Sequence, residues 1–126
     1  MSPLVTLKDP RVRICRDVRD GQCVNPTHRI EAGAIVWTHA SFAVDGPGGV
    51  SISLVIRTED GREVYRLGPA PLARGGQLPP TRLPAPFAPG SYVATLEGEF
   101  VESANTRRPL LGMPKWEFVV AAERQH

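Results

Sequence analysis

The chain has 126 residues, a length that holds one hydrophobic core, so we expect a single domain over residues 1–126. Its 41% hydrophobic and 22% charged residues are typical of a folded protein and exclude an intrinsically disordered one. The formal net charge of +2, from 15 basic and 13 acidic residues, excludes a strong positive field, and we expect no nucleic-acid partner.

The first residues lack the basic, apolar and small-residue pattern of a secretory signal. We expect a cytoplasmic protein if Met1 is the natural start, and a periplasmic or extracellular one if a leader has been removed. Every apolar run is shorter than the roughly 18 to 20 residues that cross a bilayer, so no transmembrane segment is expected.

Thirteen prolines and twelve glycines favour turns between short strands over long helices, and indicate an all-β fold. The N-terminal third offers two candidate strands, Leu4 to Leu7 and Val12 to Val18. Cys15 lies within the second candidate strand, and Cys23 follows it. A tight turn at residues 20–21 would place Arg19 opposite Gln22, a register that does not bring the thiols together. The sequence leaves open a disulfide or two partly buried thiols.

The middle of the chain predicts a three-stranded meander. Residues 34–44 are rich in β-branched and aromatic side chains, and residues 45–49 form a glycine-rich loop. Residues 50–57 show the clearest period-2 alternation, which predicts one buried face. An Asp-Gly turn at residues 60–61 precedes a strand over residues 63–67. The buried face of the second strand consists of Val50, Ile52, Leu54 and Ile56.

Prolines crowd residues 68–90, so this segment is expected to be an extended crossover between two sheets rather than a central strand. Residues 91–101 alternate again, and residues 105–111 form a polar loop or, at most, a short helix. The last strand spans residues 115–121. The inward residues of these two strands are expected to be Tyr92, Ala94, Leu96, Phe100, Trp116, Phe118 and Val120.

Residues 57–65, with their Asp-Gly turn, and residues 88–96, with Pro-Gly-Ser-Tyr before a strand, resemble bacterial immunoglobulin-like domains. The resemblance implies an immunoglobulin-like Greek-key β-sandwich of about seven or eight strands. Tyr92 is similar to a tyrosine corner, whose hydroxyl bonds to nearby backbone. Carbohydrate-binding domains of O-antigen exporters and small periplasmic modules share this resemblance, but it implies no binding residue in this sequence.

Potential soft metal ligands are scattered, and no nucleophile motif such as Gly-x-Ser-x-Gly is present. We therefore expect neither an enzyme nor a metal or cofactor site. The ligand types are His28, His39, His126, Cys15, Cys23 and Met113.

A run of arginines occupies the first third of the chain, with aspartates interleaved. Ion pairing along an exposed strand is the first expectation, and binding of an anion or an acidic partner is the alternative. The residues are Arg11, Arg13, Arg16 and Arg19, with Asp9, Asp17 and Asp20.

Without catalytic chemistry, the surface is expected to carry the function. We expect a non-enzymatic protein-interaction module, an accessory or stabilising subunit of a larger assembly, with other protein subunits as partners. The alternative is a carbohydrate-binding module with a glycan or small-molecule ligand, for which an exposed Trp37 would be the platform. The segment 106–114 either contacts the partner or folds back on the sandwich; its candidate contacts are Arg107, Arg108, Leu110, Leu111 and Met113.

Overall fold

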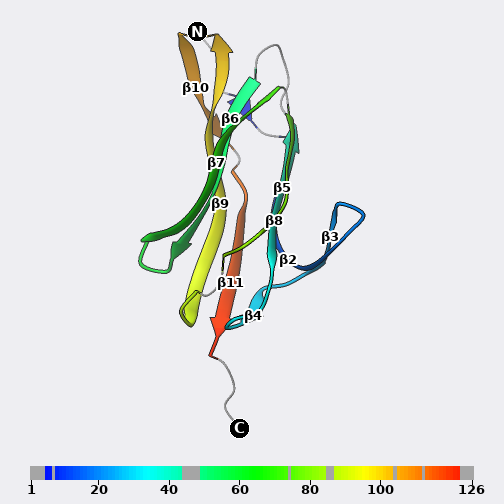
Figure 1. Cartoon of the computed structure of the whole chain (residues 1–126). Helices are drawn as coiled ribbons and strands as arrows, with labels where there is room; N and C mark the ends of the chain where they lie inside the picture. The colour runs from blue at the N-terminus through cyan, green and yellow to red at the C-terminus, as the bar shows by residue number, and fades with distance from the viewer. Residues whose placement is uncertain are drawn as a thin grey trace.

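The computed structural model describes residues 5–6, 8–43, 49–73, 75–84, 87–103, 105–111 and 113–122. Over these ranges the chain is all-β, and its strands form two sheets that face each other (Figure 1). No helix that could cross a membrane occurs within these ranges. The strands are β1 (Val5–Thr6), β2 (Lys8–Arg19), β3 (Gln22–Pro26), β4 (Arg29–Glu31), β5 (Trp37–Ala43), β6 (Gly49–Thr58), β7 (Glu63–Ala73), β8 (Gly75–Arg82), β9 (Gly90–Ser103), β10 (Thr106–Leu111) and β11 (Lys115–Ala121).

The long strand β9 organises the larger sheet. From Tyr92 to Val101 it pairs with β6 on one side, and β7 pairs with the far edge of β6. On its other side β9 pairs first with β11 and then with β10. The short strands β4 and β1 extend this side by parallel pairing with β11 and β10. Strand β9 therefore joins the part of the larger sheet that contains β6 and β7 to the part that contains β10 and β11.

The smaller sheet has the order β3-β2-β5-β8. Strand β5 lies between β2 and β8 and is antiparallel to both. Strand β2 pairs with β5 from Lys8 to Cys15, whereas β3 pairs with β2 only from Cys15 to Arg19. Among the described strands, the first half of β2 is thus paired on one side only.

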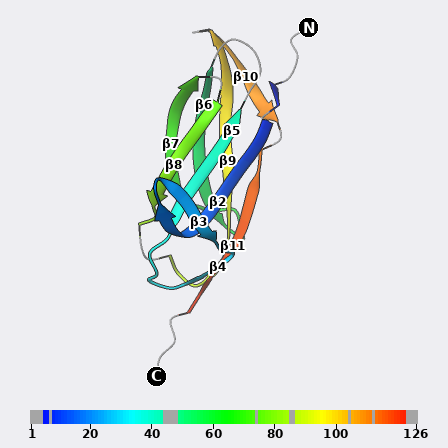
Figure 2. The ribbon, with the colours of Figure 1, turned by 90° about the vertical axis from the view of Figure 1, so that its right-hand side faces the viewer.

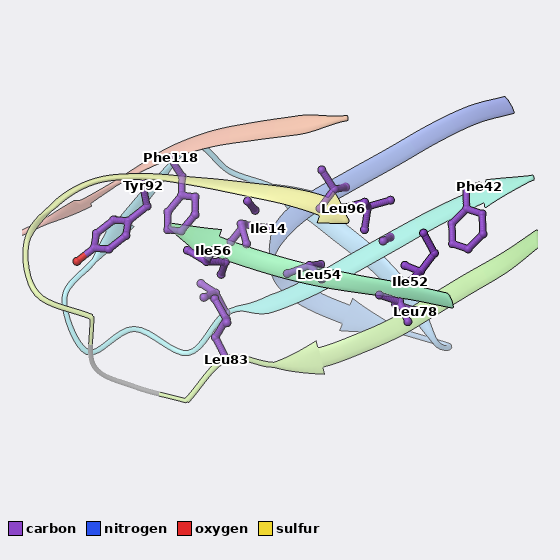
Figure 3. Close-up of a cluster of buried hydrophobic side chains, with 14 of the residues drawn as sticks. Ile14, Phe42, Ile52, Leu54, Ile56, Leu78, Leu83, Tyr92, Leu96 and Phe118 are labelled. Atoms are coloured by element: carbon purple, nitrogen blue, oxygen red, sulfur yellow. The ribbon is translucent and has the colours of Figure 1, made fainter. Parts of the chain in front are cut away.

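The core lies between the sheets, as the alternation of the sequence predicts. Ile52, Leu54 and Ile56 of β6 are fully buried, and Tyr92, Ala94, Leu96 and Phe100 of β9 are buried as well. Ile14, Phe42 and Leu78 of the smaller sheet point toward them (Figure 3). Phe118 and Val120 of β11 are buried, while Trp116 is half-buried and packs against the core. The inward faces predicted from period-2 patterning are confirmed.

The proline-rich segment does cross between the sheets, because β7 belongs to the larger sheet and β8 to the smaller one. Most of residues 68–82 continue as strand, which the expectation of an extended crossover does not specify, but neither β7 nor β8 is a central strand. Each of the two strands pairs on one side only, with β6 and β5 respectively. Edge strands tolerate proline because a missing N–H can face solvent.

Three further expectations need correction. The predicted three-stranded meander is wrong, because β5 belongs to the smaller sheet while β6 and β7 pair in the larger one. Residues 106–111 form β10 rather than a loop or helix, because Arg107 and Arg108 pair with Val101 and Phe100 of β9. The structure also has more strands than the expected seven or eight, since short edge strands such as β3 and β4 carry too few residues to show alternation.

The hairpin of β2 and β3 holds a disulfide between Cys15 and Cys23, whose Cα atoms are 5.7 Å apart. The expected register is present, with Arg19 opposite Gln22 and Cys15 opposite Pro26. The inference that this register separates the thiols is nevertheless wrong, because it assumes a regular hairpin. Asn25 adopts a left-handed conformation (φ 54°) inside β3, so the hairpin that holds the disulfide departs from regular strand geometry although its register is unbroken.

Candidate functional site

A groove runs between β2 and β11, where the two sheets meet at one side of the sandwich. Figure 2 shows these two strands next to each other. The groove has a volume of about 390 Å³. Its lining combines basic, aromatic and proline side chains: Pro10, Arg11, Val12, Arg13, Pro26, Pro114, Lys115 and Trp116.

The topology leaves two strand edges at this groove. Along Pro10–Arg13, β2 pairs with β5 alone, because β3 joins only at Cys15. Strand β11 pairs with β9 throughout, but β4 joins its other edge only from Val119 onward. Among the described strands, none pairs with the groove-side edges of Pro10–Arg13 or Lys115–Trp116. The groove therefore lies beside backbone that a further strand could reach.

Trp116 forms a fixed aromatic wall. Its Nε1 donates a hydrogen bond to the backbone oxygen of Thr27 at 2.9 Å. The His28 ring stacks on it, with ring centres 3.8 Å apart and an interplanar angle of 11°. The Nδ1 of His28 lies 2.6 Å from the backbone oxygen of Glu117; since a carbonyl only accepts, this nitrogen carries the proton. These contacts hold the indole in one orientation at the groove.

Three cations face the groove without an anionic partner. Within the described ranges, no carboxylate lies within ion-pair distance of Arg11, Arg13 or Lys115. The Nε of Arg13 is buried and has no hydrogen-bond acceptor there. A buried guanidinium donor without an acceptor costs free energy. Because the Nε is closed to solvent, an incoming carboxylate would be held by the terminal nitrogens of Arg13, which are not among the buried unpaired atoms of the described residues.

The expected ion pairs along the arginine run are absent from the described part of the chain. Asp17 instead accepts a hydrogen bond from Nδ2 of Asn25 at 2.8 Å. The guanidinium of Arg16 turns toward Thr27 and donates to its hydroxyl and to the backbone oxygen of Arg29. Asp9, which also belongs to the run, is exposed and does not line the groove. The first expectation is therefore wrong for these residues.

A second hollow, of about 530 Å³, lies on the larger sheet near the start of β9. Its lining includes Val93, Glu117 and Val119, with Glu59 from the turn after β6 and His28 from the segment before β4. Val119 is 41% exposed, which is unusual here for a large apolar side chain. This hollow combines apolar and acidic side chains, whereas no acidic residue lines the basic groove.

A cluster of charges covers the outward side of β6, β7 and β9. Glu97 forms a short ion pair with Arg57 and lies 3.8 Å from Arg66. Glu63 accepts hydrogen bonds from Arg66, the closest at 2.7 Å. These bonds, and the positive charges of Arg66 and Arg57, hold the pKa of Glu63 below its ordinary value. Two carboxylates and two guanidinium groups thus satisfy one another, so this cluster is assigned a structural role.

The candidate contacts on β10 and beyond do not gather on one surface. Arg107 is exposed and lies 3.7 Å from Glu99, and Arg108 is half-buried. Leu110 is buried in the core, and Met113 packs against it, as in the alternative that the segment folds back on the sandwich. The side chain of Leu111 is outside the described residues. A partner contact at Arg107 stays a prediction.

The remaining candidates lie apart from the groove. Trp37 is half-buried on β5, between Cys15 of β2 and Arg82 of β8. His39 is buried on the same strand, and its Nε2 bonds to the side-chain oxygen of Gln77 at 2.9 Å. His126 is outside the described residues. Over the described ranges, no three His, Cys, Asp or Glu side chains are close enough to hold a metal ion.

No protein-family model matches the chain, and no curated protein matches it either. Fold and site together define the protein as a two-sheet β-sandwich with a basic groove at its side. Sequence reasoning singled out Arg11 and Arg13 but missed Lys115 and Trp116 as their neighbours. No local signal joins these segments, which are about a hundred residues apart and meet only through the pairing of the sheets.

Proposed function

We propose that this chain is a non-enzymatic protein-interaction domain and acts as an accessory or stabilising subunit of a larger assembly. The observation that carries the proposal is the groove between β2 and β11, with two strand edges that lack partners in the described chain. Binding at an exposed strand edge is a common way for one protein to engage another.

Two other edges of the sandwich also carry prolines. Strand β7 carries Pro69 and Pro71, and β8 carries Pro79 and Pro80. Proline cannot donate a backbone hydrogen bond and blunts an edge against pairing, and the groove edge of β2 has one such residue, Pro10. The groove offers instead three unpaired cations and the fixed ring of Trp116. Aromatic and arginine side chains are enriched where proteins contact one another.

The same proposal includes an immunoglobulin-like fold and an oxidising compartment. The hydrogen bond from the Tyr92 hydroxyl to the backbone of Ala88 supports the first, because it matches a tyrosine corner. The Cys15–Cys23 disulfide supports the second, since such bonds persist in the periplasm and outside the cell. We therefore include in the proposal a periplasmic or extracellular location in a bacterium.

The test is purification of the tagged chain from its native source under non-reducing conditions, followed by size-exclusion chromatography. We expect a complex of defined stoichiometry that also forms when the identified partner carries the tag. Tagging the partner guards against adventitious capture of an abundant protein. A chain that elutes alone at its monomer size, with no partner recovered reciprocally, would refute the proposal.

Trp116 supports a second candidate function, the binding of an anionic carbohydrate. Sugars stack on aromatic rings, and Arg11 and Lys115 beside Trp116 supply positive charge for acidic groups. Trp37, the platform expected from sequence, lies away from this groove. A glycan array that includes sulfated and uronic-acid sugars tests this candidate, and an absence of binding to all of them would exclude it.

A further inference from the structure

We propose that the groove between β2 and β11 binds an acidic segment of the partner protein in extended conformation. The inference rests on the proposed function and adds to it the chemistry of the partner. Four features of the groove support it: the positive charge of its lining, the unpaired Nε of Arg13, the strands that form its two sides, and the apolar residues of its lining.

The charge of the lining selects an anion. Arg11, Arg13 and Lys115 bring three positive charges to a groove whose described lining contains no acidic residue. The chain as a whole has a net charge of only +2, so this concentration of positive charge is local. Complementary charges speed the encounter of two proteins and disfavour partners of the wrong sign.

Arg13 indicates that the anion is a carboxylate held closely. Its side chain is half-buried, and its Nε has neither solvent nor a described acceptor. A guanidinium presents several N–H groups in one plane, a geometry that suits a carboxylate bound by two hydrogen bonds. A partner Asp or Glu would bind the terminal nitrogens of Arg13, which are not among the buried unpaired atoms of the described residues.

The shape of the groove suits an extended chain. Pro10–Arg13 forms one side as strand, and at about 3.3 Å per residue four such residues run for about 13 Å. Lys115 and Trp116 form the opposite side as the start of β11. A segment lying along these strands can alternate carboxylates toward the cations with apolar side chains toward the apolar part of the lining.

The apolar part of the lining distinguishes a peptide from a small anion. Val12, Trp116 and three prolines line the groove beside the cations. Apolar and proline surfaces contribute nothing to a free inorganic anion, but they bury the alternate side chains of a bound strand. The mixture of apolar and cationic lining therefore favours a peptide with alternating acidic and apolar residues.

Fluorescence of Trp116 gives a direct measurement. In the Trp37→Phe variant, Trp116 is the single tryptophan, and its emission reports on the groove. The probe is an eight-residue peptide of alternating Glu and Val with blocked ends. We expect a saturable change in emission, and weaker binding at 0.5 M salt than at low salt, because screening lowers the attraction between charges. A peptide of alternating Lys and Val should cause no such change.

Charge variants locate the binding. We expect Arg11→Glu, Arg13→Gln and Lys115→Glu together to weaken binding of the acidic peptide by at least about tenfold. The matched control changes Arg19→Glu, Arg82→Gln and Arg62→Glu, three exposed cations outside the groove, and should bind as the parent does. Circular dichroism checks that both variants are folded.

Three results would overturn the inference: no binding of the acidic peptide, equal binding by the groove variant, or binding of a sulfated oligosaccharide in its place. The last result would favour the anionic carbohydrate. Failure here is distinct from failure of the proposed function. If the native complex forms and persists in the groove variant, the interaction function stands and this site is wrong; if no native complex exists, the function itself fails.

Discussion

The hydroxyl of Tyr92 donates a hydrogen bond to the backbone oxygen of Ala88, four residues earlier in the chain. Tyr92 is buried, and its ring packs 5.5 Å from that of Phe118 and 5.3 Å from that of Phe87. This one side chain therefore ties the end of the proline-rich crossover to the start of β9. The bond is the one that the sequence predicts for a tyrosine-corner residue.

Tyr92→Phe should lower the free energy of unfolding by about 1 kcal/mol, because it removes one hydrogen bond and keeps the ring packing. Urea unfolding followed by tryptophan fluorescence measures the change. Tyr65→Phe is the matched control: the structure records no hydrogen bond for its hydroxyl, so its removal should be close to neutral. Equal losses in the two variants would show that the Ala88 bond adds no stability.

Gly98→Ala should destabilise the protein by about 3 kcal/mol or more, as expected for overpacking in a closely packed sheet. A Cβ at this position would overlap the backbone oxygen of Ser51 and lie 3.0 Å from the Cα of Ile52. Neither backbone atom can move unless β6 and β9 separate, because Ile52 and Gly98 are directly paired.

A suitable control for this change is Gly33→Ala, which has a positive φ of 84° but no atom within 4 Å of the new Cβ. We expect it to cost only about 1 kcal/mol, the penalty of an L side chain in the left-handed region. Thermal unfolding of both variants compares the two costs. A loss for Gly98→Ala as small as that for Gly33→Ala would contradict the close approach of the strands.

Loss of the Cys15–Cys23 disulfide should lower the free energy of unfolding by about 2 to 3 kcal/mol, from the entropy of the short loop that it closes. The variant is Cys15→Ala with Cys23→Ala, compared with the oxidised parent in urea. The reduced parent should resemble the variant. If reduction leaves the unfolding midpoint of the parent unchanged, the two thiols are not linked in the folded protein.

Acid should weaken the charge cluster on the larger sheet. The hydrogen bonds from Arg66 hold the pKa of Glu63 below its ordinary value of 4.5. A carboxyl group whose pKa is lower in the folded state stabilises the fold above the unfolded value, and this contribution disappears as the pH falls through the folded value. The free energy of unfolding should therefore decrease as the pH falls below about 4.5.

Glu63→Gln should show a smaller decrease over the same pH range, since the amide does not titrate. Salt at 0.5 M should reduce the difference between the parent and the variant, because Glu63 is exposed and its interactions are screened. Urea unfolding at several pH values measures both effects. Identical pH dependence in the parent and in Glu63→Gln would show that this carboxylate does not contribute.

The sequence predicts the buried faces of β6, β9 and β11 because alternation is a local property. It predicts the Arg19–Gln22 register for a similar reason, since a two-residue turn defines it. The disulfide lies beyond such reasoning, because one left-handed residue, Asn25, alters the hairpin. The groove is harder still to predict, since Arg13 and Trp116 become neighbours only when two sheets pack.

The position of β9 in the larger sheet determines when the groove between β2 and β11 can form. Its partner β6 starts at Gly49, and its other partner β11 ends at Ala121, so the sheet closes through contacts between distant parts of the chain. Such topologies fold slowly, on a scale of about milliseconds to seconds. During synthesis the hairpin of β6 and β7 emerges long before β11, which supplies one wall of the groove. The groove therefore forms only after β11 has been made, and the proposed partner segment cannot bind there earlier in synthesis.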